Sequence, residues 1–313
     1  MALPGTLLVI CYCGSMLLGV FARTSFPRYH SESPEVGRLV QRYDGRHDHR
    51  RPHELGFGYY YQGDIMLPEQ QSVDRVSLSN KFPSSLWPNG VVPYYFAPDT
   101  FKPNEIYMIE KAMDEFHRQT CVRFVPRTPQ TPYYVTITNR ETGCFASIGR
   151  RENNGQNLLN LQTPNCLYGG TPVHEMMHVL GFLHEVSRAD RDEYIHIDRS
   201  ALARQYQTGN FFAINFGKDV DGSTTTYNIS YNYGSIMHYS KTAGSVDGRK
   251  QVLFNLRPYA KDDFGSDRLT APDIESVKYR YCQGSSSGDG AFSLLPFITS
   301  KASRILSYSR SSF

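Results

Sequence analysis

Three histidines and a glutamate lie close together between Thr171 and Glu185, in the stretch TPVHEMMHVLGFLHE. His174 and His178 are four residues apart. On an α-helix both imidazoles would therefore face the same side and could bind one metal ion. Glu175, next to the first histidine, would project beside that metal and could take a proton from water. These residue types at this spacing indicate a hydrolytic metal site.

The residues around the histidines fit a short helix followed by a sharp turn. Thr171 is suited to cap the helix, and Pro172 is suited to its first position. Gly181 can adopt the positive φ that ends a helix. The turn would bring His184 back as a third ligand, and three neutral imidazoles leave positions open on zinc, as catalysis requires. The alternative is a helix whose histidines only satisfy hydrogen bonds in a core.

Two motifs resemble those of one protease family. The stretch from His174 to His184 has the metzincin spacing H-E-x-x-H-x-x-G-x-x-H and continues as H-E-x-x-R-x-D-R-D to Asp192. Ser235-Ile236-Met237-His238-Tyr239 follows downstream. Together these motifs resemble the astacin family of zinc endopeptidases, over about Trp87 to Cys282. Val186-Ser187 departs from the family, which often has His-Thr there.

The resemblance implies a mechanism. One zinc ion would be bound by His174, His178 and His184 and would activate a water molecule. Glu175 would act as general base and then pass the proton to the leaving amine. Tyr239 would help to stabilise the oxyanion. The expected function is hydrolysis of peptide bonds in protein or peptide substrates, and the alternative is a secreted, non-catalytic zinc-binding protein derived from such a protease.

The resemblance also assigns supporting roles. Met237 would form a tight turn beneath the imidazoles, and Glu185 would lie near the N-terminus of the mature protein. The charged residues from Arg188 to Asp192 would brace the turn near the site, rather than form a surface ion-pair cluster. The strand expected over residues 155–162 matches the family's edge strand, which binds substrate backbone by strand addition; a plain core strand is the alternative.

The implied fold class is α+β, a metzincin/astacin-like catalytic domain. A twisted sheet and helices would form the upper half, the lower half would be irregular, and zinc would lie in the cleft between them. Residue patterns predict strands over 91–96, 122–125 and 133–138. Apolar residues at helical spacing predict a helix from 103 to 120. Residues 227–239, rich in Tyr, Asn and Gly, are expected to be a loop.

The N-terminus indicates secretion. Leu7 to Ala22 is an apolar run, and residues 1–22 are expected to be a signal peptide, with a short signal anchor as the alternative. No other segment of the 313 residues is apolar enough to suggest stable membrane association. A net charge of +3 without a basic, aromatic stripe argues against nucleic acid as a partner.

Residues 23–77 are charged and rich in Pro and Gly, and we expect a propeptide that cannot build its own core. The run from His47 to His53 is interpreted as solvated and flexible, rather than metal-binding. Residues 61–65, Y-Q-G-D-I, resemble the family's propeptide switch, in which Asp64 would ligate the zinc in the zymogen; an ordinary turn is the alternative. The protease domain is expected over residues 78–282; no basic residue precedes Leu78 directly, so cleavage by an activating protease after Arg75 is the candidate.

Four cysteines remain after the signal peptide, an even number that suits an oxidising compartment. Three pairings are open, and the resemblance implies Cys144 with Cys166 and Cys121 with Cys282. Asn228 begins a glycosylation sequon. The Ser-rich tail, residues 283–313, is expected to be disordered.

Overall fold

The computed structural model describes residues 33–66, 86–151, 157–207, 209–219 and 225–283. The predicted signal peptide, the cleavage near Arg75 and the tail beyond residue 283 lie outside these residues. Within the described part of the chain, no helix is both long enough and apolar enough to span a bilayer.

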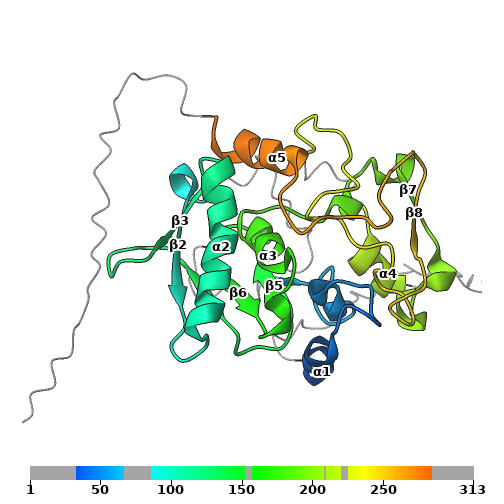
Figure 1. The fold of residues 1–313 in the computed structure, drawn as a ribbon. Coiled ribbons are helices and arrows are strands. Elements are labelled where there is room, and N and C mark those ends of the chain that lie inside the picture. Colours follow the sequence, from blue (N-terminus) through cyan, green and yellow to red (C-terminus); the bar gives the residue numbers. More distant parts are fainter. Residues whose placement is uncertain (1–32, 67–85, 152–156, 208, 220–224, 284–313) are drawn as a thin grey trace, which may run out of the picture.

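The upper half is a six-stranded sheet covered by two helices (Figure 1). The strands lie in the order β1-β5-β6-β4-β2-β3, and only the β5–β6 pair is antiparallel. Their bounds are β1 Ile65–Met66, β2 Val91–Phe96, β3 Arg123–Pro126, β4 Val135–Thr138, β5 Cys144–Ser147 and β6 Leu158–Leu161. The three strand predictions at 91–96, 122–125 and 133–138 are confirmed to within two residues.

Helix α2 (Pro103–Gln119) confirms the predicted amphipathic helix. Its buried side chains are Ile109, Ala112, Met113 and Phe116, spaced three and four residues apart. It contacts α3 (Thr171–Val179), and α3 packs against β5 and β6. The first two histidines are thus on a helix that is held from two sides.

The lower half has little regular structure. It contains a two-stranded sheet of β7 (Ile195–Ile197) and β8 (Leu253–Asn255), helix α4 (Gly209–Phe216) and short 3-10 turns. Residues 227–239 contain no helix or strand, as predicted. Helix α5 (Ala271–Tyr281) then returns to the upper half (Figure 1). The α+β class with an irregular lower half is confirmed.

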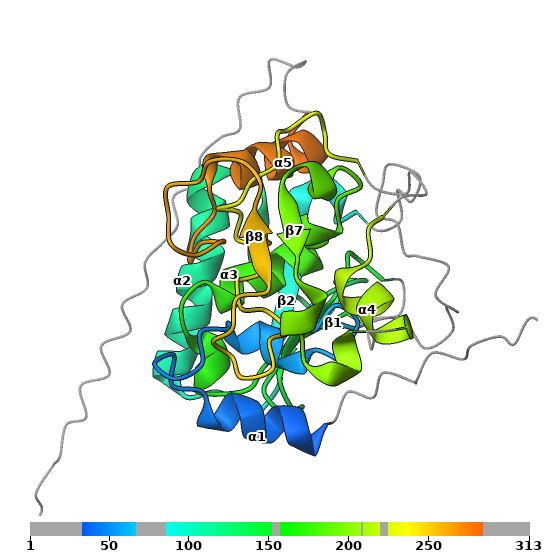
Figure 2. The same cartoon turned by 90° about the vertical axis from the view of Figure 1, so that its right-hand side faces the viewer.

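The N-terminal segment, residues 33–66, packs against both halves (Figure 2). It comprises α1 (Pro34–Arg42), a 3-10 turn at Pro52–Gly56 and β1. Val36, Val40, Leu55 and Tyr60 belong to the upper core, whereas Phe57 belongs to the lower core. The segment contributes to the domain's cores instead of forming one of its own.

Two interpretations of the sequence are wrong, the first in part. The run from His47 to His53 is solvent-exposed at His47 and His49, as expected, but not at its end, because His53 is 2% exposed. The strand over residues 155–162 is not an edge strand, because β6 lies between β5 and β4. Without β1, the edge strand next to β6 would be β5. In this chain β1 of the N-terminal segment pairs with β5 in parallel. The sequence does not reveal which of the two short buried strands, β5 or β6, lies nearer the edge of the sheet.

Two disulfides stabilise the upper half, with the pairing that the resemblance implied. Cys144 on β5 is bonded to Cys166. Cys121, just after α2, is bonded to Cys282 at the end of α5, across 161 residues of sequence. The second bond therefore closes a loop that contains the entire lower half.

Candidate metal centre

Helix α3 begins one residue earlier than the sequence suggested. Gly170 occupies the cap position, so Thr171 is the first helical residue and Pro172 the second. A Cβ at position 170 would lie 2.4 Å from Cδ1 of Ile236, which explains the glycine. Gly181 has φ +93°, as predicted, and ends the helical region before the chain turns toward His184.

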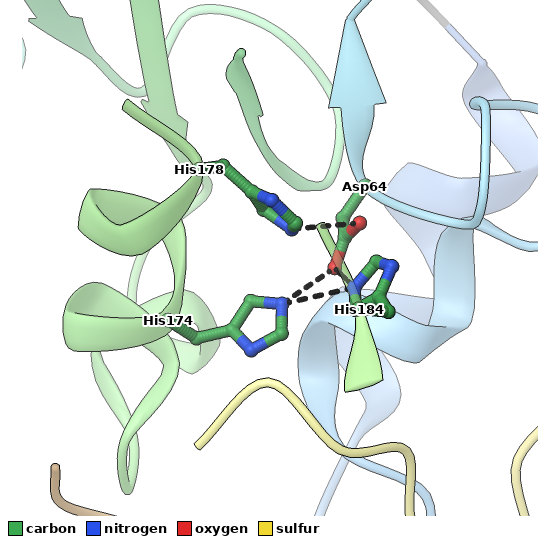
Figure 3. A group of neighbouring side chains, drawn as sticks. All are labelled: Asp64, His174, His178 and His184. Carbon is green, nitrogen blue, oxygen red and sulfur yellow. Dashed lines mark hydrogen bonds and ion pairs between the residues drawn. The ribbon is translucent and has the colours of Figure 1, made fainter. Parts of the chain in front are cut away.

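The three histidines converge on one buried point together with Asp64 of the N-terminal segment (Figure 3). Asp64 Oδ2 lies 3.0 Å from His174 Nε2 and 3.2 Å from His184 Nε2. Asp64 Oδ1 lies 3.3 Å from His178 Nε2. The structure thus brings together all four residues that the sequence proposed as ligands.

The outer nitrogen of each imidazole has a hydrogen-bond acceptor. The Nδ1 atoms of His174 and His178 each lie 2.7 Å from a backbone carbonyl oxygen, of Ile236 and Phe182 respectively. His184 Nδ1 lies 2.9 Å from Oε1 of Gln62. Because carbonyl oxygens only accept, Nδ1 carries the proton in each ring, which leaves the Nε2 lone pairs free to bind a metal.

These residues fit a zinc ion. The Nε2 atoms of His174 and His184 are 3.2 Å apart, and two nitrogens bound to tetrahedral zinc would be about 3.3 Å apart. Burial lowers the pKa of His184 to about 4 against the opposing effect of Asp64, so the ring is neutral, as a ligand must be. His178 Nε2 and Asp64 Oδ1 are buried and 3.3 Å apart, and neither forms a hydrogen bond within the described residues.

Glu175 is buried beside the first ligand. Neither of its carboxylate oxygens has a hydrogen-bond partner in the part of the chain that the structure describes. Burial raises the pKa of the Glu175 carboxyl well above its usual range, and the charge of Asp64 raises it further. An unpartnered buried carboxyl next to a metal site is available to exchange a proton with a bound molecule.

Tyr239 connects the centre to the lower half. Its hydroxyl donates to the carbonyl oxygen of Gln62 at 2.9 Å and lies 3.3 Å from Nδ1 of His184. Burial raises the pKa of the Tyr239 phenol well above its usual value, so the hydroxyl keeps its proton and can donate.

Three residues of the N-terminal segment to which the sequence assigned no role contact the first ligand or the chain around Tyr239. The ring of His53 stacks on that of His174, with centroids 3.9 Å apart. Glu54 accepts from the backbone N–H and the hydroxyl of Ser240, at 2.5 and 2.6 Å. Arg51 donates to the carbonyl oxygens of His238 and Phe264. No local pattern marks these residues, since their partners lie more than 100 positions away.

The supporting residues lie next to the third ligand. The backbone N–H of Glu185 donates to the carbonyl of Met237 at 2.9 Å. Arg188 binds Asp190 through two nitrogens and Glu185 through a third, at 2.8 to 3.1 Å. Arg191 is 5% exposed and donates to the carbonyls of Val186 and Phe216. These contacts join the turn after His184 to the lower half.

Comparison with known proteins gives the family. The model of the peptidase family described as Astacin matches residues 79–282. The chain belongs to the astacin family. The two halves, with the histidines between them, therefore form an astacin fold. The centre suits zinc, the metal that appears in the names of several relatives.

Curated relatives from invertebrates and a solved fish structure resemble this astacin. "Zinc metalloproteinase nas-7" of Caenorhabditis elegans is 38% identical over 198 residues, 62% of this chain and 47% of the relative. "Blastula protease 10" of Paracentrotus lividus is 34% identical over 71% of this chain and 38% of its own length. The chain thus spans about half or less of these relatives. The structure of high choriolytic enzyme 1, a hatching enzyme zinc-protease from Oryzias latipes, matches with TM-score 0.54 and 31% identity, over 63% of this chain and 92% of that one.

Proposed function

We propose that this astacin is a secreted zinc-dependent endopeptidase that hydrolyses peptide bonds in extended polypeptides. One observation supports the proposal most strongly: the three Nε2 atoms converge on one buried point, with the unpartnered carboxyl of Glu175 beside it. A zinc ion held by His174, His178 and His184 would lower the pKa of a water molecule and polarise the scissile carbonyl.

The remaining chemistry is assigned to the chain's own residues. Glu175 takes the proton from the attacking water and delivers it to the leaving amine. The hydroxyl of Tyr239 donates a hydrogen bond to the oxygen of the attacked carbonyl as charge develops there. Met237 lies in the turn that supports the imidazoles, and Glu185 receives the N-terminus of the processed domain.

The proposed domain organisation follows from the same function. Residues 1–22 are a signal peptide, 23–77 a propeptide, 78–282 the protease domain and 283–313 a tail. Asn228, which is exposed and has φ +60°, carries a glycan in the secreted protein. Protein substrates and an activating protease are the expected partners.

The test is casein hydrolysis by the secreted protein after limited trypsin treatment, with and without 1,10-phenanthroline. Glu175→Ala, processed identically, is the control. We expect chelator-sensitive cleavage by the wild type, reduced on the order of 10²–10⁴-fold in the variant because it lacks the general base. A folded, zinc-loaded and trimmed wild type that cleaves nothing would favour the non-catalytic alternative.

We further propose that Asp64 keeps the unprocessed chain latent by occupying the position that water needs. The support is its distance of 3.0 to 3.3 Å from all three Nε2 atoms. Asp64→Ala in the unprocessed chain should raise peptide hydrolysis above the wild-type background, whereas Asp44→Ala, on the exposed surface of the same segment, should not. Equal background activity in both variants would contradict the switch.

A further inference from the structure

Phe57 is the side chain by which the N-terminal segment enters the lower core. It is 2% exposed, and the other buried members of its cluster lie between Val186 and Phe264. Its ring centroid is 5.0 Å from that of Tyr239, 5.5 Å from Phe216 and 6.2 Å from Tyr206. Aromatic side chains of the lower half thus enclose this ring in a pocket.

The pocket also binds backbone. The hydroxyl of Tyr206 donates to the carbonyl oxygen of Phe57. Gly58, the next residue, has φ +82°, and a Cβ there would lie 2.8 Å from the Tyr206 ring. A peptide therefore presents two features to this site, a large ring and its own carbonyl.

The walls of the pocket are held by contacts that do not involve Phe57. The carbonyl of Phe216 accepts from Arg191 at 2.7 Å, and its ring stacks on Phe212 with centroids 5.6 Å apart. The backbone N–H of Tyr206 donates to Ala203 at 2.8 Å. The carbonyl oxygen of Asn215 lies 3.2 Å from the hydroxyl of Tyr239 and could accept its proton when Gln62 is absent. These contacts would remain after removal of the N-terminal segment.

The pocket lies close to the reaction centre. The Tyr239 ring contacts both Phe57 and His184, with centroid distances of 5.0 and 4.5 Å. One side chain therefore separates the pocket from a metal ligand. The family match begins at residue 79, so Phe57 lies outside the part of the chain that the family model matches.

We propose that in the processed enzyme this pocket is a substrate subsite that selects phenylalanine or an equally large aromatic side chain near the scissile bond. This inference rests on the proposed function. Tyr206 and Phe216 determine the specificity, and the Tyr206 hydroxyl binds the carbonyl of the selected residue. In the unprocessed chain, Phe57 occupies the subsite.

Binding by the processed, zinc-loaded Glu175→Ala protein tests the subsite without requiring turnover. Alanine-based octapeptides, each with one phenylalanine at a different position, are titrated and compared with all-alanine. Burial of the ring should make one position bind about tenfold to a hundredfold more tightly. If every phenylalanine peptide bound with a dissociation constant within about twofold of that of the all-alanine peptide, the proposal would be overturned.

Three variants in the same background localise the effect. Phe216→Leu should reduce the phenylalanine preference several-fold, whereas Phe116→Leu, an equally buried ring in the upper core, should not. Tyr206→Phe keeps a ring but loses the hydroxyl donor. It should therefore weaken the binding of all peptides while keeping the preference for phenylalanine. A preference unchanged by Phe216→Leu would place the subsite elsewhere and overturn the assignment.

The same peptides offered to the processed wild type separate this proposal from the proposed function. Cleavage without a phenylalanine preference would overturn the subsite and leave the endopeptidase function intact. Selective binding of the phenylalanine peptide without any cleavage would support the subsite as a binding pocket and contradict the endopeptidase function.

Discussion

The two halves of the molecule are held together by different means. The upper half has mainly aliphatic side chains packed between a sheet and helices, and it contains both disulfides. The lower half has short elements and a cluster rich in tyrosine and phenylalanine, and its described residues include no disulfide. The lower half instead uses hydrogen bonds from Arg191 and a ring, Phe57, supplied by the N-terminal segment. Its stability is therefore expected to depend on whether that segment is bound.

Breaking the Cys121–Cys282 bond should have the largest effect. This disulfide closes a loop of 161 residues that contains the lower half, whereas Cys144–Cys166 closes one of 22. Chain entropy predicts a loss of about 5 kcal/mol in unfolding free energy for the Cys121→Ser/Cys282→Ser double variant, against about 3 kcal/mol for the other pair. Guanidinium unfolding of both double variants measures the difference. Equal losses would mean that the long loop does not constrain the lower half.

Removing the ring that the N-terminal segment supplies should come next. Phe57→Ala should lower the unfolding free energy of the unprocessed chain by about 3–5 kcal/mol, because it leaves a cavity in the lower core. Tyr59→Ala, two residues away and 39% exposed, should change it by about 0.5 kcal/mol or less. Guanidinium unfolding at fixed pH compares the two. Similar losses in both variants would show that the lower half does not depend on Phe57.

The smallest effect concerns pH. Burial raises the pKa of Glu54, against the opposing effects of Arg51 and Ser240. The folded chain therefore holds this proton more tightly than the unfolded chain, and the associated stability is lost as pH rises above the usual glutamate pKa of about 4.3. Glu54→Gln should remove that loss.

Unfolding free energies of the unprocessed wild type and Glu54→Gln from about pH 2 upward test this, and parallel profiles above about pH 4 would contradict it. Asp190→Asn is a control of opposite sign. A hydrogen bond from Arg188 lowers the pKa of Asp190, so its contribution is present at higher pH and is lost as pH falls.

The sequence predicted what depends on local spacing. The ligand helix, the turn at Gly181 and the amphipathic α2 follow from residue types a few positions apart, and their locations are confirmed to within a few residues. The predictions from sequence failed where contacts between distant residues determine the structure. His53 is within a charged run, but its ring stacks on His174, 121 positions away. The order of β5 and β6 is likewise fixed by pairing across the sheet, which two four-residue buried strands do not encode.

The covalent link between the N-terminal segment and the domain has a kinetic consequence. In the uncut chain, Asp64, Glu54 and Phe57 contact their sites as parts of one molecule. If the segment keeps the chain latent as proposed, it would compete with substrate at an effective concentration on the order of millimolar, whatever the amount of protein present. A single cut before residue 79 would convert the segment into a free ligand that obeys mass action. Dilution would then complete activation. The cut protein would stay inhibited at high concentration, where the segment remains bound, and would become active at low concentration, where the segment dissociates.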